Sequence, residues 1–314
     1  MLIIFALVTF VLAENTMVIN WGRVINASDP SFTAAISWED CVSTCYESTY
    51  CVLAFGRSGY CSLYNFGMVF EVLKWLPADG NDGNYVAFKT SSGDSSCPET
   101  PFENFQVEIL DLNYQYTTFM YTLIFVSDLW MFEYTVNRTC PPDWKTFTRP
   151  STKFCLKLFT NVNKMYTYAD ATALCQAQNA TLGGLESDEE RVYVYETGSA
   201  VSAMDSFKGG GYRVDGHRKE SCMSPDQWNT TDCYKTKAFD FTDKFLTTYG
   251  GYKWVEGRPD GFNSTLGAFE LCVQLWTQKG VGDLAGNVDD TICESTNTAY
   301  FAVRGYLCGK VPGN

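Results

Sequence analysis

The most informative stretch of the chain runs from Gly257 to Cys308. It contains Gly257-Arg258-Pro259-Asp260, Glu270-Leu271-Cys272-Val273-Gln274-Leu275-Trp276, Val288-Asp289-Asp290-Thr291-Ile292-Cys293 and Tyr306-Leu307-Cys308. Four carboxylates therefore stand at fixed distances from a pair of cysteines, and one of them follows a proline. Carboxylate oxygens are ligands that calcium prefers. This stretch is the candidate binding site, although it also holds an arginine.

The residues before this stretch predict an α+β module stapled by cysteines. Cys140-Pro141-Pro142-Asp143-Trp144 opens it, and Phe154 to Phe159 is a strand pattern. Apolar residues at helical spacing predict a helix over Tyr168 to Ala180 that buries Cys175. Ser187-Asp188-Glu189-Glu190 is a capping-box pattern that begins a second helix.

A long glycine-rich segment, Gly209 to Asn263, follows and contains Cys222 and Cys233. Its hydrophobic periodicity is low, so we expect irregular structure. A compact domain rarely carries so long an irregular segment without a functional reason. We therefore expect the binding site to involve this loop.

These motifs together resemble a C-type lectin-like domain over residues 139–312. They are Cys140 to Trp144, the Cys175 helix, Leu182 to Glu190, Cys272-Val273-Gln274-Leu275, Cys293 and Leu307-Cys308. The resemblance implies two helices, two small sheets and a long loop. It also implies the disulfides Cys140–Cys155, Cys175–Cys308 and Cys272–Cys293, with Cys222–Cys233 closing the loop.

The resemblance further implies a carbohydrate site built around calcium. In such domains a Glu-Pro-Asn or Gln-Pro-Asp triplet with a cis proline, a later Glu and a Trp-Asn-Asp segment supply the oxygens. The matching residues here are Arg258-Pro259-Asp260, Glu270 and Val288-Asp289-Asp290. The implied calcium ligands are Asp260, Glu270, Asp289 and Asp290.

Arg258 departs from that pattern, because a guanidinium has five donors and no acceptor. Two unit charges roughly 4 Å apart repel by about 4 kcal/mol at an effective dielectric near 20. We therefore favour a site in which Arg258 makes bidentate bonds to Asp290 or Glu270 and replaces calcium. Calcium-dependent sugar binding and a degenerate site without a ligand are the alternatives, and no other cofactor is indicated.

Aromatic residues near the site are candidates for stacking on a sugar. Trp254 and Trp276 flank strands, where tryptophans are more often part of the core. Phe262 and Tyr249 lie in the predicted loop and are the better candidates.

A separate cysteine-rich module precedes the lectin-like one. Ser37 to Asp40 is a capping-box pattern, so Cys41 and Cys45 lie on one face of a helix. Cys51 and Cys61 lie in strand-like segments, and the sequence alone allows any of three pairings.

This module, residues 17–90, resembles the CW-type branch of the PAN/apple-like family. The matching residues are Ser37 to Cys41, Cys45, Cys51, Cys61-Ser62-Leu63-Tyr64 and Asn84 to Lys89. The resemblance implies a helix on an antiparallel sheet, the pairs Cys41–Cys61 and Cys45–Cys51, and a partner-binding role. A stapled scaffold without a ligand is the alternative.

Residues 91–138 form a linker and a predicted β connector. The apolar run Tyr114 to Ser127 is shorter than the roughly 20 residues that cross a bilayer. Its aromatic and β-branched content predicts strands and no membrane span. Cys97 is left over from the pairs above, which predicts a free thiol or a disulfide-linked dimer.

Composition places the chain outside the cell. Met1 to Ala13 is an apolar run typical of a cleaved secretory signal. Thirteen cysteines fit an oxidising compartment, and five glycosylation sequons begin at Asn26, Asn137, Asn179, Asn229 and Asn263. A net charge of −13 disfavours nucleic-acid partners and anionic membrane surfaces. The sequence predicts a secreted acidic glycoprotein.

The sequence gives little support to an enzyme. Its single histidine, His217, lies in Asp215-Gly216-His217-Arg218-Lys219, with no nucleophile elbow around it. We expect a surface loop residue there. The predicted function is non-catalytic binding of glycans or glycoproteins, in innate defence. The alternative is a lectin-fold adhesion module that binds a protein without calcium-dependent sugar binding.

Overall fold

The computed structural model describes residues 15–74, 84–91, 105–109, 116–204, 206–207, 209–228, 230–263, 267–278, 284–297 and 301–313. The predicted signal, Cys97 and Asn229 lie outside these residues. The chain forms two compact units, Met1–Arg138 and Thr139–Asn314. Within the described part of the chain, every helix is too short or too polar to cross a membrane.

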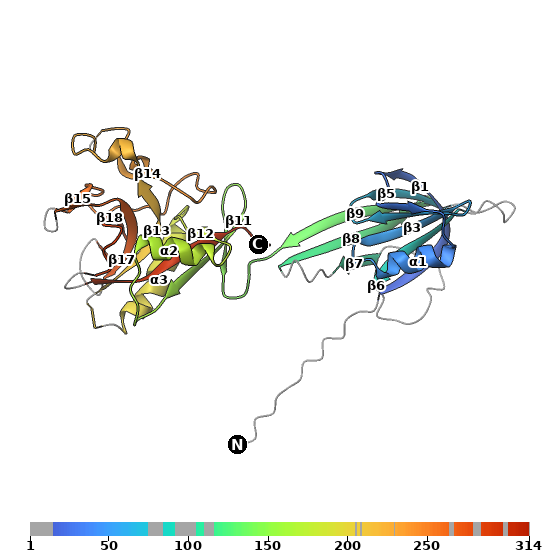
Figure 1. The fold of residues 1–314 in the computed structure, drawn as a ribbon, viewed down its shortest axis with the longest axis horizontal. Helices are drawn as coiled ribbons and strands as arrows, with labels where there is room; N and C mark the ends of the chain where they lie inside the picture. Colours follow the sequence, from blue (N-terminus) through green and yellow to red (C-terminus); the bar gives the residue numbers. More distant parts are fainter. Residues whose placement is uncertain are drawn as a thin grey trace, which may run out of the picture. The chain divides into compact units, whose positions relative to one another are not determined.

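The first unit is a nine-stranded antiparallel sheet with one helix (Figure 1). Its strands are β1 (Asn15–Ala27), β2 (Phe32–Ala34), β3 (Cys51–Arg57), β4 (Tyr60–Asn65), β5 (Val69–Lys74), β6 (Tyr85–Ser91), β7 (Phe105–Ile109), β8 (Thr117–Val126) and β9 (Leu129–Arg138). They lie in the order β2-β4-β3-β6-β1-β5-β9-β8-β7.

Helix α1 (Trp38–Glu47) begins where the capping pattern predicts. The Ser37 hydroxyl accepts a hydrogen bond from the Asp40 N–H at 3.1 Å, which satisfies one free donor of the first turn. Two disulfides then tie the helix to the sheet, Cys41–Cys61 to β4 and Cys45–Cys51 to β3. These are the pairs that the PAN-like resemblance implies.

The connector strands belong to the sheet of this first unit. The apolar run predicted as strand is β8, which pairs with β7 and β9, and β9 pairs with β5. Tyr121, Leu123, Trp130 and Phe132 from these strands are buried in the hydrophobic core. The strand prediction is confirmed, and the structure supplies the placement that the sequence left open.

The second unit is built on a larger sheet of eight strands and a two-stranded one. Its strands are β10 (Lys145–Thr148), β11 (Lys153–Thr160), β12 (Thr181–Leu182), β13 (Gly209–Arg218), β14 (Phe239–Asp240), β15 (Phe262–Asn263), β16 (Ala268–Phe269), β17 (Cys272–Gln278), β18 (Val288–Thr291) and β19 (Phe301–Lys310). The main path is β10-β11-β19-β13-β17-β18. Among the described pairings of these strands only β13–β19 is parallel, and an isolated parallel bridge joins Trp254 to Val288 of β18.

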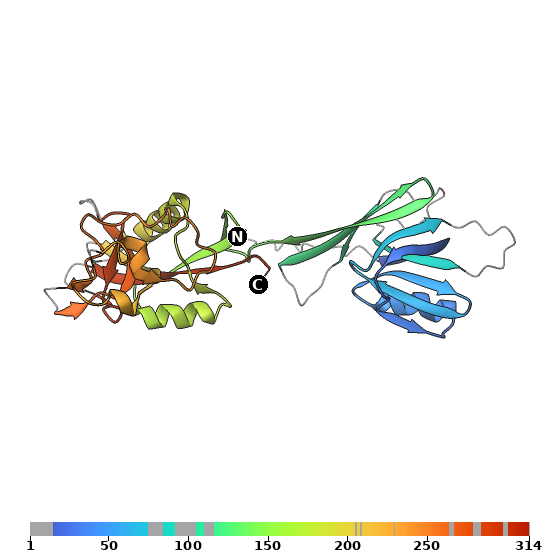
Figure 2. The same ribbon diagram turned by 90° about the horizontal axis from the view of Figure 1, so that it is seen from above.

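Two α-helices flank this sheet, α2 (Tyr168–Gln176) and α3 (Asp188–Ser202), and Figure 2 shows them on opposite sides of it. Thr167 and Asp170 form a full capping box at the start of α2. The helix ends before the predicted Ala180. Cys175 is buried as predicted, together with Ala171, whereas Leu174 is exposed. Ser187 caps α3 as predicted. Two short 3₁₀ turns, η1 (Glu220–Cys222) and η2 (Lys235–Ala238), lie in the loop.

The prediction of irregular structure from Gly209 is wrong for the first ten residues. They form β13, a central strand that is buried along almost its whole length. Close packing favours glycine here. A Cβ on Gly210 would lie 2.5 Å from Ser202 Oγ of α3, and one on Gly211 would lie 2.9 Å from Gln274 Oε1, so that side chain would have to shift. The glycines mark the close approach of helix and strands. The long loop begins after Arg218.

The remaining disulfides are those that the lectin-like resemblance implies. Cys140–Cys155 and Cys175–Cys308 hold the start of the unit and α2 to the sheet. Cys222–Cys233 closes part of the long loop, and Cys272–Cys293 joins β17 to the turn after β18. The hydrophobic core behind them includes Leu156, Val214, Val273, Leu275 and Leu307.

Candidate functional site

The structure brings the six predicted site residues together at the end of the long loop. Arg258, Pro259 and Asp260 lie in the returning loop, Glu270 stands just before β17, and Asp289 and Asp290 lie on β18. The Arg258–Pro259 peptide bond is cis. We call these residues the Arg258 site.

The Arg258 guanidinium lies among three of the four carboxylates. Its Nη1 is 2.5 Å from Asp260 Oδ1 and 3.1 Å from Glu270 Oε2, and its Nε is 3.5 Å from Asp289 Oδ1. Burial acts to lower the pKa of Arg258, but the surrounding carboxylates outweigh it and raise the pKa. The guanidinium therefore remains charged and occupies the place to which these oxygens point.

Asp290 is held by a different arginine from the one expected. Arg218, at the end of β13, donates from Nη2 to Asp290 Oδ2 at 2.6 Å and from Nε to the Glu270 carbonyl at 3.1 Å. The N–H groups of Asp260 and Gly261 donate to Asp290 Oδ1 and Oδ2 at 3.2 and 2.7 Å. Arg258 contacts Glu270, one of its two expected partners, through Nη1 alone and without the expected bidentate geometry, whereas Asp290 is bound by Arg218.

Asp289 is the least compensated carboxylate of the site. Its Oδ2 accepts a hydrogen bond from Trp276 Nε1 at 3.3 Å. Its Oδ1 faces Arg258 without hydrogen-bond alignment. Burial raises the pKa of Asp289 to about 7, because the loss of hydration outweighs the attraction of Arg258. The pKa of Asp290 is raised as well, again mainly by burial.

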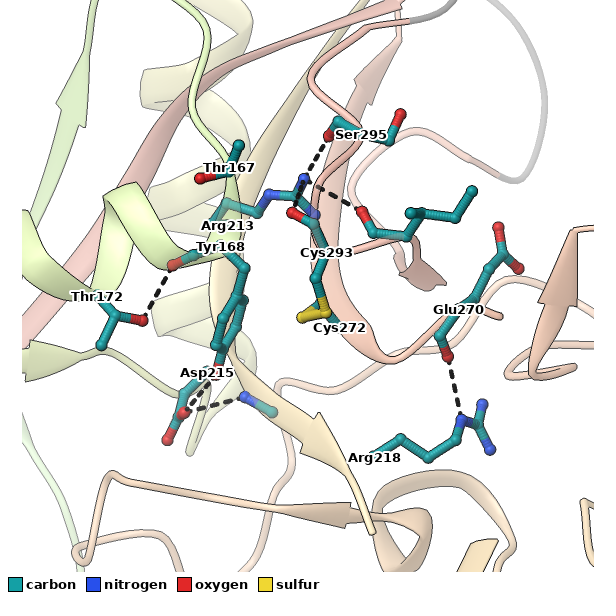
Figure 3. The surroundings of a disulfide bond; sticks show 12 residues. Thr167, Tyr168, Thr172, Arg213, Asp215, Arg218, Glu270, Cys272, Cys293 and Ser295 are labelled. Atoms are coloured by element: carbon teal, nitrogen blue, oxygen red, sulfur yellow. Dashed lines mark hydrogen bonds between the residues drawn. A yellow bond between two sulfur atoms is a disulfide. The ribbon is translucent and has the colours of Figure 1, made fainter. Parts of the chain in front are cut away.

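A second buried arginine fixes the turn after β18, as Figure 3 shows around the Cys272–Cys293 disulfide. Arg213 Nη2 donates to the carbonyl oxygens of Cys293 at 3.1 Å and Ile292 at 3.4 Å, and also to that of Ser295. Burial lowers the pKa of Arg213 to about 10. The disulfide and Arg213 together set the end of the strand that carries Asp289 and Asp290.

Sequence reasoning missed both arginines of β13. Apolar Tyr212 and Val214 alternate with Arg213 and Asp215, a period-two pattern that indicates a strand. The run Gly209-Gly210-Gly211 obscured this signal. His217 is exposed, as expected, but it lies on the strand and not in a loop.

The Arg258 site does not fit a calcium ion as it stands. Oxygens of Asp260, Glu270 and Asp290 lie within 4.8 Å of one another, which is close enough for a shared ion. Calcium, however, takes 6–8 oxygens. Here Arg258 contacts Asp260 and Glu270, and both Asp290 oxygens already accept hydrogen bonds. Another cluster, His217 with Cys272 and Cys293, lacks free thiols because the cysteines form a disulfide.

The four aromatic candidates for stacking on a sugar lie in different environments. Trp254 and Tyr249 pack against the core, with Trp254 stacked on Phe239 at 5.4 Å. Phe262 stacks against Trp228 at 6.4 Å. Trp276 is half-buried and borders a pocket beside Arg258.

Three of the five predicted glycosylation sites have side chains that the structure describes. Asn26, Asn137 and Asn179 are all exposed. Asn229 lies outside the described residues, and the side chain of Asn263 is not described. Accessibility therefore agrees with modification at these three, which stays a prediction.

Solved structures of C-type lectin-like domains are similar to this chain. The carbohydrate-recognition domain of cow CD23 has 16% identity, covers 55% of this chain and 97% of its own, and has a TM-score of 0.34. The mouse scavenger receptor C-type lectin domain has 19% identity, covering 55% and 99%, with a TM-score of 0.34. Herring type II antifreeze protein has 22% identity, covering 55% and 98%, with a TM-score of 0.34. No curated protein matches the chain.

Two family models match the chain in sequence. A PAN-like domain matches residues 17–90. The model described as C-type lectin domain-containing protein 141/158 matches residues 144–311, which is more than half of the chain. The expected order, PAN-like and then C-type lectin-like, is confirmed. With this match and the fold described above, the chain belongs to the C-type lectin domain-containing protein 141/158 family.

Proposed function

We propose that this protein binds glycans or glycoproteins through the Arg258 site, and that it does so without calcium. The fold and family support a lectin-like recognition domain. The observation that carries the proposal is the guanidinium of Arg258, which contacts Asp260 and Glu270 at 2.5 and 3.1 Å. Like a metal ion, it neutralises the carboxylates and fixes the loop, and its outer edge remains accessible to a ligand.

The proposed setting is extracellular, with recognition of foreign glycans in innate defence as the role. Six disulfides and two domains of extracellular type fit a secreted protein. The apolar N-terminal run and the exposed sequons point the same way. The dimer through Cys97 remains a prediction, and gels with and without reductant test it.

We also propose that the protein is not an enzyme. C-type lectin-like domains are generally non-catalytic. The cysteines near His217, Cys272 and Cys293, form a disulfide, so neither offers it a thiol nucleophile.

A glycan array run in calcium and in chelator tests the proposal. We expect the same binding in both, because Arg258 stands where an ion would contribute. Arg258→Gln should weaken glycan binding at least about tenfold, since one lost charged hydrogen bond already costs about 1.5–3 kcal/mol. Lys253→Gln, at an exposed site of the same unit, removes the same charge and serves as the control.

Two outcomes would contradict this proposal. Binding that chelator abolishes would show that an ion enters the site despite Arg258. Binding to no glycan at all would favour the alternative function, a lectin-fold adhesion module that recognises a protein.

A further inference from the structure

A pocket of about 260 Å³ lies beside Arg258, over β17 and β18. Gln274 and Asp289 are paired across these strands, so their side chains are on the same face. The pocket is also lined by Trp276, Thr291 and Phe301. The volume is below the roughly 300–1,000 Å³ of sites for drug-sized ligands. The pocket therefore suits one small group or one sugar ring.

Two buried acceptors in this lining have no hydrogen-bond donor among the described residues. They are Gln274 Oε1 and Asp289 Oδ1. The two residues are only 2% and 8% exposed. Buried polar atoms in native proteins are nearly always paired, and an orphaned one costs free energy. A ligand that brings donors to this wall would recover that cost.

The charge of the lining favours a cationic ligand. Three carboxylates, Glu270, Asp289 and Asp290, border the pocket, against the single guanidinium of Arg258. Arg258 and Arg218 make their short contacts to Asp260, Glu270 and Asp290. Among the described residues, the cation nearest to Asp289 is Arg258, whose Nε lies 3.5 Å from Oδ1. A small positive group that donates hydrogen bonds would compensate it.

The aromatic side of the pocket adds a second preference. The Trp276 and Phe301 rings meet edge to face at 4.8 Å. Aromatic faces attract cations within about 6 Å and pack against the apolar face of a ring. A protonated amine on a sugar ring combines these properties, because an ammonium group has three donors and no acceptor.

We propose that this pocket binds the protonated amine of an unacetylated amino sugar. The amine lies against Asp289 and Gln274, and the sugar ring lies on Trp276. This inference rests on the proposed function, since it names the class of glycan that the site prefers. Acetylation of the amine removes its charge and two of its three donors, so the pocket should reject the N-acetylated sugar.

Calorimetric titration of the full chain tests this with four small probes, at a pH where the amines are protonated. The probes are glucosamine, N-acetylglucosamine, glucose and N-α-acetyl-lysine methylamide. We expect glucosamine to bind at least about tenfold tighter than each of the other three. Equal affinity for glucosamine and glucose would overturn the proposal. Equal affinity for the lysine derivative would overturn the assignment to a sugar.

Asp289→Asn is the decisive variant, because it keeps an oxygen for Trp276 Nε1 and replaces the charge and the other acceptor oxygen by an amide NH2. It should reduce glucosamine affinity about tenfold or more and leave glucose unchanged. Asp240→Asn, at an exposed position on β14, is the matched control for net charge. Near-ultraviolet circular dichroism checks that each variant keeps its packing, and unchanged glucosamine affinity in folded Asp289→Asn would overturn the proposal.

The glycan-binding proposal and the amine assignment are overturned by different results. Array binding of neutral glycans in chelator, together with no preference for glucosamine, overturns the amine assignment alone. Preferential glucosamine binding that Arg258→Gln leaves intact, together with no array binding of any neutral glycan, overturns the proposed role of Arg258 in glycan binding and keeps the amine assignment.

Discussion

The second unit contains two arginine–carboxylate clusters that differ in burial and in completeness. Arg149 pairs with Glu190 and Asp243, and all three side chains are at most 1% exposed. Arg258 pairs with Asp260, Glu270 and Asp289, but its own side chain is 32% exposed. The same chemistry thus serves as an internal support in one place and as an accessible surface in the other.

The buried cluster satisfies its groups. Arg149 donates to both Glu190 oxygens at 2.8 and 3.1 Å, to Asp243 at 2.8 Å and to the Gly184 carbonyl at 3.2 Å. Glu190 also accepts from the Glu186 N–H at 2.7 Å. Burial nevertheless outweighs Arg149 and raises the pKa of Glu190. At the Arg258 site an Asp289 oxygen has no such partner among the described residues. The difference separates a cluster that holds the scaffold from one that is arranged for a ligand.

Arg149→Met should have the largest effect on stability. It leaves Glu190 and Asp243 buried without a cation, and breaking a buried pair from one side typically costs about 3–5 kcal/mol. Urea unfolding with fluorescence detection measures the loss in the free energy of unfolding. A loss under about 1 kcal/mol would contradict the view that this cluster supports the fold.

Arg258→Gln should cost less, about 1–2 kcal/mol, because water reaches the guanidinium it removes and screens the carboxylates. It should also make the unfolding temperature rise in millimolar calcium, since calcium binding to the folded state stabilises it by mass action. Wild type should show no such rise. If calcium does not raise the unfolding temperature of the variant either, Arg258 is not the only residue that excludes the ion. The ion pair between Arg218 and Asp290 would then contribute to the exclusion.

The sequence predicted much of the scaffold because cysteines, caps and apolar periodicity act locally. Ser37 and Ser187 cap their helices, Cys175 is buried, and the apolar run that contains Leu123 is a strand, as predicted. The strand β13 was missed because Gly210 is selected by the approach of α3, which is a tertiary contact. Local propensity cannot reveal such a contact.

The candidate site was only partly predictable for the same reason. A motif placed Arg258, Asp260 and Glu270 near one another, but motif spacing carries no information about side chains from other strands. Arg218 and Gln274 reach the site from β13 and β17, and their roles depend on strand register. The choice between calcium and arginine likewise depended on distances that only the fold supplies.

A third, exposed cluster extends the comparison and should show the smallest effect. Asp188, the first residue of α3, lies 2.8 Å from Arg191 Nε and 2.7 Å from Lys253 Nζ. Hydrogen bonds from Arg191 and Lys253 lower the pKa of Asp188 from 3.8 to about 2. Because the folded pKa is depressed, the stability that Asp188 contributes is present above pH 4 and is lost as the pH falls through 2.

Asp188→Asn should therefore lower the unfolding temperature slightly at pH 6, less than either arginine variant, because exposed ion pairs contribute little. The difference from wild type should shrink in 1 M salt, which screens exposed charges, and should shrink further as the pH falls to 2, where folded-state Asp188 is about half protonated. Thermal unfolding followed by circular dichroism at both pH values measures it. A difference as large at pH 2 as at pH 6 would mean that Asp188 acts through packing or through uncharged hydrogen bonding at the helix start. Burial would then not explain the order of the three clusters in stability.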